Sequence, residues 1–178
     1  MARQIVLLRG INVGSRNRVA MPELREALEE VGYEDVQTYL QSGNVLLSST
    51  AKPASVARKC ERQIAAKFDL DIAVVVRTGA ELAKVVQRNP LGKIAKDPKR
   101  YQVSFLSAEL GAEAVRKLEA AAVEPEQFVV IGREVYAWHP DTIARSRLWA
   151  LLAGQGLGVT ATSRNWTTVT KLLEMLDG

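Results

Sequence analysis

Residues 36–49 read VQTYLQSGNVLLSS, and this stretch decides the fold class. Two segments rich in β-branched and apolar residues flank Ser42, Gly43 and Asn44, residue types that a tight hairpin turn requires. The sequence therefore predicts two antiparallel strands joined by a turn at this tripeptide. A ligand contact through Ser42 and Asn44 is the alternative, and it would need the turn to lie beside the loop that follows the first strand.

Segments with helical periodicity lie on both sides of this hairpin. On its N-terminal side, the apolar run Ile5–Leu8 predicts a buried strand, and a helix follows that Pro22 opens and Gly32 ends. On its C-terminal side, Pro53 opens a second helix, and the run IAVVV at residues 72–76 predicts another strand. The resulting order, βαββαβ, is that of a ferredoxin-like unit.

The pattern restarts after Arg77. The segment YQVSFL alternates as a strand, a helical segment follows it, and FVVIGREVYAW predicts a second hairpin that turns near Gly132. A helix around residues 143–153 and a last helix complete this half. We therefore predict an α+β fold of two small α/β sandwich units in tandem. The first, residues 1–78, is ferredoxin-like, and the second, residues 79–178, is βαββα-like with an extra C-terminal helix.

The composition excludes several classes of protein. The chain has 178 residues, of which 47% are hydrophobic, so it can bury an ordinary core. It has one cysteine, Cys60, and one histidine, His139, which excludes a His-rich metal site and argues against a Ser-His-Asp triad and a Cys-His pair. The lone cysteine predicts a reducing cytoplasm, and the absence of an apolar run of about 20 residues predicts no membrane partner. We expect Cys60 to be a small buried hydrophobe and His139 to lie in a surface loop.

The net charge of +4 is unevenly distributed along the chain. Residues 1–22 contain four arginines and no acidic residue. Residues 142–173 contain three arginines and one lysine, again without an acidic residue. Folding could bring these two stretches together into one anion site. The alternative is a solvated surface with chance clustering.

The loop after the first strand combines glycines, amides and arginines. Gly10 and Gly14 match neither the dinucleotide-binding fingerprint nor the phosphate loop of nucleotide hydrolases. Backbone amides near a helix N-terminus nevertheless point at anions, and arginine holds phosphate or carboxylate through two parallel hydrogen bonds. For the glycines alone, the simpler interpretation is a turn that needs positive φ. Arg9 directly follows a buried strand, so its head group needs a partner or a cleft.

The start of the last helix is the second informative stretch. Thr162 or Ser163 is a natural N-cap, which would place Arg164 in the first turn, where the helix dipole disfavours a cation. An anion bound there would remove the conflict, and a salt bridge to a carboxylate elsewhere is the alternative. The spacing assigns Trp166 to the apolar stripe of this helix, so we expect it to pack rather than to stack on a base.

Four segments resemble one bacterial family, the domain of unknown function 1697. They are LLRGINVG, YLQSGNVLLSS, DPKRYQVSFL and TSRNWTTVTKLLEM, and the RSRL segment resembles that family's Ser-Lys-Leu with Arg147 in place of lysine. The resemblance implies a two-part α+β protein with a ferredoxin-like first half and no established activity. It also implies that the loop 9–14, the turn 42–44 and the helix start 164–168 are the family's signature positions.

These observations lead to three hypotheses of function. The first is a module that binds an anion, either a phosphorylated small molecule or a nucleic acid, in a basic cleft between the N-terminal loop and the C-terminal helix. The second is an interaction protein whose arginines hold its fold or a dimer together, and the third is an enzyme on a phosphorylated or acidic substrate. We identify no catalytic residue, metal ligand or cofactor, and the oligomeric state stays open. The candidate ligand-binding residues are Arg9, Gly10, Asn12, Gly14, Ser42, Asn44, Arg147, Arg164, Asn165, Thr168 and Lys171.

Overall fold

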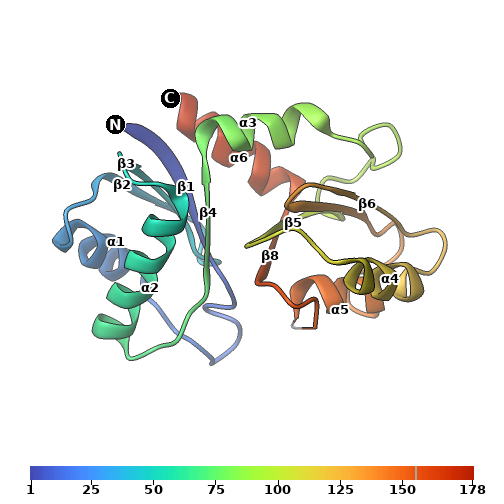
Figure 1. Ribbon diagram of the computed structural model, residues 1–178, viewed down its shortest axis with the longest axis horizontal. Coiled ribbons are helices and arrows are strands. Elements are labelled where there is room, and N and C mark those ends of the chain that lie inside the picture. The colour runs from blue at the N-terminus through green and yellow to red at the C-terminus, as the bar shows by residue number, and fades with distance from the viewer. Residues whose placement is uncertain (155) are drawn as a thin grey trace. The chain divides into compact units, whose positions relative to one another are not determined.

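The computed structural model describes residues 1–154 and 156–178, which divide into two compact units (Figure 1). Unit 1 comprises residues 1–83 and 172–178, and unit 2 comprises residues 84–171. The division passes through two helices, α3 (Gly79–Arg88) and α6 (Trp166–Asp177), so each of them contributes residues to both units.

Unit 1 follows the predicted βαββαβ order. Its elements are β1 (Ala2–Leu8), α1 (Met21–Glu30), β2 (Glu34–Tyr39), β3 (Asn44–Ser49), α2 (Pro53–Phe68) and β4 (Val74–Thr78). The strands form one antiparallel sheet in the order β2-β3-β1-β4. Prolines stand in the first turns of α1 and α2, where the missing N–H costs nothing. The ferredoxin-like prediction for this half is confirmed.

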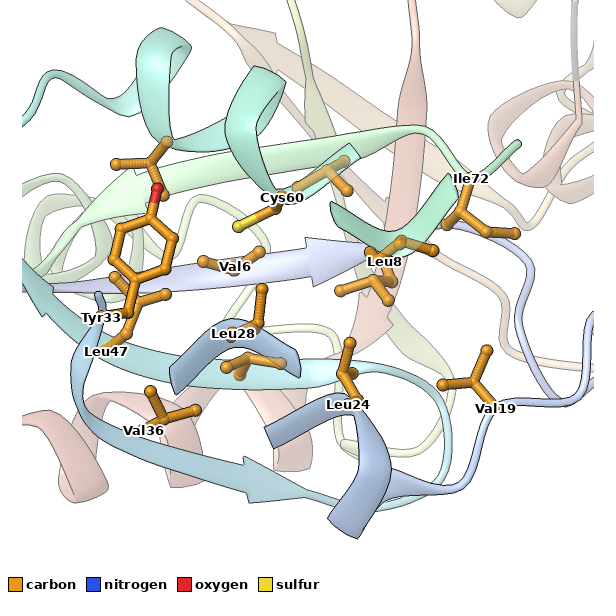
Figure 2. Close-up of a cluster of buried hydrophobic side chains, with 14 of the residues drawn as sticks. Val6, Leu8, Val19, Leu24, Leu28, Tyr33, Val36, Leu47, Cys60 and Ile72 are labelled. Carbon is orange, nitrogen blue, oxygen red and sulfur yellow. The ribbon is translucent and has the colours of Figure 1, made fainter. Parts of the chain in front are cut away.

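The main core of unit 1 lies between its sheet and the helices α1 and α2 (Figure 2). Alternate residues of β1, Val6 and Leu8, face Leu24 and Leu28 of α1 and are fully buried, as the period of two along a strand requires. Cys60 of α2 belongs to the same cluster and is also fully buried, as predicted. Burial raises the pKa of its thiol to about 12, so the thiol stays protonated and unreactive at neutral pH.

Unit 2 repeats the same topology with different residues. Its elements after α3 are β5 (Tyr101–Leu106), α4 (Ala112–Ala121), β6 (Gln127–Ile131), β7 (Glu134–Trp138), α5 (Arg147–Ala153) and β8 (Ala161–Asn165). The sheet order is β6-β7-β5-β8, with every pair antiparallel. Strands β5, β6, β7 and β8 of unit 2 thus correspond to β1, β2, β3 and β4 of unit 1, respectively. The predicted fold class, α+β units in tandem, is confirmed.

Strand β8 is the element that the sequence prediction missed. The segment ATSRN carries no apolar run, and its Thr162 and Ser163 are residue types that favour an N-cap, which made it look like the start of the last helix. In the structure Ser163 pairs with Ser104 of β5, and their hydroxyls are 2.5 Å apart. Helix α6 begins only at Trp166. The prediction of a helix start at Thr162 or Ser163 is therefore wrong, because tertiary strand pairing overrides the local signal.

Candidate functional site

The loop after β1 and the turn between β2 and β3 meet at one end of the unit 1 sheet. The backbone N–H of Leu8 donates to the carbonyl of Gly43 at 2.9 Å, and Asn12 Nδ2 donates to the carbonyl of Gln41 at 2.7 Å. A Cβ atom at Gly43 would lie 2.8 Å from the Cβ of Leu8. The two segments are therefore in direct contact, which satisfies the geometric condition for Ser42 to line the same site as the loop.

Asn12 fixes the shape of the loop. It adopts φ +55°, a left-handed conformation that asparagine tolerates better than most residues. Its Oδ1 accepts from the N–H of Val19 at 2.8 Å, and its Nδ2 donates to the Val19 carbonyl at 2.9 Å. Its own N–H donates to the Asn17 carbonyl at 2.9 Å. The side chain thus closes the base of the loop and also holds the neighbouring turn.

The part of the loop beyond Asn12 faces solvent. Residues 13–18 are all exposed. The backbone N–H of Arg16 donates to the Val13 carbonyl at 3.1 Å, and Arg18 Nη1 donates to the Gly14 carbonyl at 3.0 Å. The result is a braced, solvent-facing loop rather than a loose chain.

Gly10 and Gly14 serve the backbone conformation of this loop. They adopt φ +66° and +58°, and neither would bring a Cβ within 4 Å of another heavy atom. Because a side chain at either position would have space, it is the positive φ and not a close contact that requires glycine there. This supports the interpretation of both glycines as turn residues. The predicted contacts of Gly10 and Gly14 with a ligand stay predictions.

The charges at this end of unit 1 are mostly positive. Residues 9–22 contain Arg9, Arg16 and Arg18 and no carboxylate. The connection between α2 and β4 reaches the same end, because the N–H of Arg9 donates to the Ala73 carbonyl at 3.0 Å, and this connection carries the exposed Asp69 and Asp71. The arginine-rich side of the loop is therefore bordered by acidic groups on the β4 side.

The turn residues are held by their own hydrogen bonds. Asn44 is fully buried, and its Nδ2 donates to the Tyr39 carbonyl at 2.9 Å and to Ser42 Oγ at 3.1 Å. Gly43 adopts φ +89°, as a tight turn requires. The predicted hairpin turn is confirmed, and the Asn44 amide closes it.

Arg164 lies in a strand and not in a helix. It belongs to β8, and its side chain is only 7% exposed. Its Nη1 donates to Thr162 Oγ1 at 2.8 Å and to the Ser163 carbonyl at 2.9 Å. Burial lowers the pKa of its guanidinium to about 10, which still leaves it charged at neutral pH. The predicted conflict with the dipole of the last helix is therefore wrong.

Asn165 and Thr168 together form the actual start of α6. Asn165 ends β8, and its Oδ1 accepts the N–H of Thr168 at 2.9 Å, the hydrogen bond of an N-cap. Thr168 is buried. Lys171 lies one turn further along the same helix, and Arg147 is the exposed first residue of α5. These residues belong to unit 2, whereas the loop and turn residues belong to unit 1.

Arg77 is a functional candidate that the sequence analysis passed over. It is the penultimate residue of β4, as Arg164 is of β8, and it is 1% exposed. Arg77 Nη1 donates to the carbonyl of the preceding residue, Val76, at 3.1 Å, which parallels the bond from Arg164 to Ser163. That Arg77 and Arg164 occupy equivalent positions in the two units follows only from the repeated topology, because the sequences around them differ.

A cluster around His139 is the second feature that the sequence analysis missed. His139 is fully buried, so its predicted place in a surface loop is wrong. Its Nδ1 lies 2.6 Å from Glu126 Oε2, and Ser146 Oγ donates to the same carboxylate oxygen at 2.5 Å. Burial alone would raise the pKa of Glu126, but hydrogen bonds from Ser146 and His139 outweigh burial and lower it.

This cluster does not have the geometry of a nucleophile and its base. Ser146 Oγ is 3.4 Å from Nδ1 of His139, the ring nitrogen that also faces the carboxylate. A catalytic serine would need the opposite nitrogen, with the carboxylate behind the ring. Ser146 Oγ instead accepts the N–H of Trp149 at 3.0 Å and caps α5. The hydrogen bonds of this cluster therefore hold the first turn of α5 in place.

Neither a metal cluster nor a membrane-spanning helix is found in the described part of the chain. No group of three or more His, Cys, Asp or Glu side chains there could hold a metal ion. Among the same residues, no helix has both the length and the apolar character needed to cross a membrane.

Comparisons with known proteins agree with this architecture. The sequence model of a family described as "Protein of unknown function (DUF1697)" matches residues 1–136. A solved structure, that of the conserved bacterial protein SP0830 from Streptococcus pneumoniae, is similar with a TM-score of 0.80. The two sequences are 24% identical, and the match covers 98% of each chain, so the likeness extends over both units. No curated protein sequence matches the chain.

Proposed function

We propose that the chain, which belongs to the DUF1697 family of proteins of unknown function, binds an anionic ligand through the loop 9–18 of unit 1. The ligand is a phosphorylated small molecule or a nucleic acid. The observation that carries the proposal is a braced loop whose residues 13–18 are exposed and include Arg16 and Arg18, without a carboxylate of its own. Guanidinium groups bind phosphate through paired charge-assisted hydrogen bonds, and a braced loop loses little entropy when it binds.

Within this loop the residues divide between two roles. Asn12 and the turn residue Asn44 use their amides to hold the backbone in place. Arg16 has an exposed side chain, and Arg18 is anchored by one nitrogen to the Gly14 carbonyl. In this proposal the asparagines shape the site, and the arginines supply the charge that a phosphate needs.

A second candidate function is an interaction protein whose arginines serve the fold. The observation that favours it is the internal hydrogen bonding of Arg164 and of its counterpart Arg77. Both side chains are buried, so they act on the structure of their own units. This candidate accounts for the strand arginines and leaves the exposed loop arginines without a role. An enzymatic function has less support, because the cluster of Glu126, His139 and Ser146 lacks the geometry of a nucleophile and its base.

Thermal unfolding tests the proposal. The native chain is heated with inorganic phosphate, mononucleotides, or short single-stranded RNA and DNA, beside the double variant Arg16→Ala/Arg18→Ala. A ligand present at about a hundred times its Kd should add about 2.7 kcal/mol to the unfolding free energy of the native chain. We expect the double variant to lose this gain.

Arg116→Ala is the matched control, because Arg116 is an exposed arginine on α4 of unit 2. It should keep the full ligand effect. If the ligand is a nucleic acid, the effect should also fall steeply as salt rises, since phosphate contacts release counterions. A gain that survives the double substitution, or no gain with any of these probes, would contradict the proposal.

A further inference from the structure

Strand β6 is an edge strand of the unit 2 sheet. It is the first strand in the order β6-β7-β5-β8, and its ladder hydrogen bonds go to β7. Within residues 1–154 and 156–178, no backbone–backbone hydrogen bond outside the ladder with β7 involves this strand. An edge of this kind presents a row of N–H and C=O groups that can pair with a further strand.

The sequence of β6 lacks the usual protection of such an edge. It reads QFVVI, without a charged residue, proline or glycine, and its register with β7 is regular from Gln127 to Ile131. Phe128 and Val130 pack against the core of unit 2. Val129, on the other face of the strand, is half-buried. A regular, apolar, uncharged edge strand is what proteins otherwise avoid unless a partner covers it.

The corresponding edge of unit 1 is protected in the ways that β6 is not. Strand β2 occupies the same place in its sheet and begins with Glu34 and Asp35. Its register with β3 shifts between Glu34 and Gln37, and Asp35 adopts φ +53° at this irregularity. Charge and a bulge both discourage pairing with another chain. The contrast distinguishes β6 from the corresponding edge of unit 1.

We propose that β6 pairs antiparallel with β6 of a second copy of this chain, with Val129 at the two-fold axis. In this register each Phe128 lies across from Val130 of the other copy, on the face where both side chains are apolar. The flanking charges favour the antiparallel direction. Glu124 precedes the strand and Arg133 follows it, so antiparallel pairing brings unlike charges together at both ends, whereas parallel pairing would bring like charges together. The proposal is independent of the anion site.

The first test is the mass of the full chain in solution. Sedimentation equilibrium over a range of protein concentrations should show association from the 19.5 kDa chain to a species of twice that mass. Val129→Lys places two like charges across the axis and should raise the Kd of the dimer by about tenfold or more. Gln37→Lys, at an exposed position of the β2 edge, is the matched control and should leave the Kd unchanged.

A cysteine variant tests the register without depending on the stability of Val129→Lys. Val129→Cys should form a covalent dimer under mild oxidation, because the two thiols would face each other at the axis. Gln37→Cys should not, and neither should the native chain, whose Cys60 is fully buried. A chain that stays monomeric at every concentration would overturn the proposal, even if the β6 edge binds a different protein. So would a dimer that Val129→Lys leaves intact and Val129→Cys fails to cross-link.

Discussion

The two units share one topology but differ at two corresponding places. The connection from β1 to α1 spans residues 9–20 and is rich in arginine and free of acidic residues, whereas the connection from β5 to α4 spans only residues 107–111 and contains Glu109. The edge strand β2 is bulged and acidic, whereas β6 is regular and apolar. Since the fold needs neither feature, the long basic loop and the bare edge are where function is to be sought.

The largest effect is expected at the hairpin turns. Gly43→Ala should lower the unfolding free energy by about 3 kcal/mol, because the new Cβ would lie 2.8 Å from Leu8 Cβ and the residue has φ +89°. The corresponding turn of unit 2 contains Gly132, with φ +57° and open space around it. Gly132→Ala should cost only about 1 kcal/mol, the conformational strain alone. Urea unfolding measures both values, and equal costs would show that Leu8 does not press on the unit 1 turn.

An intermediate effect is expected from the brace of the basic loop. Asn12→Gly keeps the left-handed conformation but removes the three side-chain hydrogen bonds to Val19 and Gln41, so it should cost about 2 kcal/mol. Asn17 also has positive φ, and its side chain donates one hydrogen bond, to the Gly10 carbonyl. Asn17→Gly should therefore cost about 0.5 kcal/mol. Chemical unfolding compares the two, and a cost for Asn12→Gly no larger than that for Asn17→Gly would argue against the brace.

The smallest effect concerns pH and is confined to unit 2. The pKa of Glu126 is lower in the folded chain than in the unfolded chain. Its carboxylate therefore stabilises the fold above the unfolded carboxyl pKa, and this contribution is lost as pH falls through the folded pKa.

At pH 7, Glu126→Gln should lower the unfolding free energy by about 1 kcal/mol, because the hydrogen bonds from Ser146 and His139 lose their charged acceptor.

Unfolding of the native chain and the Gln variant at pH 7 and near pH 3 checks this assignment. The difference between them should shrink at the lower pH, because the carboxyl of the unfolded chain is protonated there and the stabilisation linked to the lowered pKa is progressively lost. A difference that is the same at both values would mean that the charge of Glu126 does not matter.

The sequence was most informative where local chemistry and fold agree. The hairpin at Ser42–Asn44 could be predicted because glycine and asparagine are what its backbone needs, and the helices after Pro22 and Pro53 because their apolar spacing matches their buried faces. The sequence distinguishes the loop by its glycines, amides and arginines, whereas the contact of the loop with the turn follows only from the structure.

Other features could not be read from the sequence, for physical reasons. Strand β8 is held by pairing with β5, a long-range contact that its polar sequence does not signal. His139 follows a strand and precedes Pro140, a loop pattern, yet it is fully buried, with its Nδ1 beside Glu126 and Ser146. The equivalence of Arg77 and Arg164 depends on a repeated topology without a repeated sequence.

The comparison between the two connections can be tested at the level of single residues. The measurement is a titration of the isotope-labelled chain with inorganic phosphate, and then with a mononucleotide, followed through the backbone amide resonances. The account predicts that amides of residues 10–18 shift in a saturable way, while those of the corresponding connection, 107–111, stay in place. Shifts of equal size in both connections, or no saturable shift in residues 10–18, would contradict the claim that the basic loop of unit 1 is an anion site.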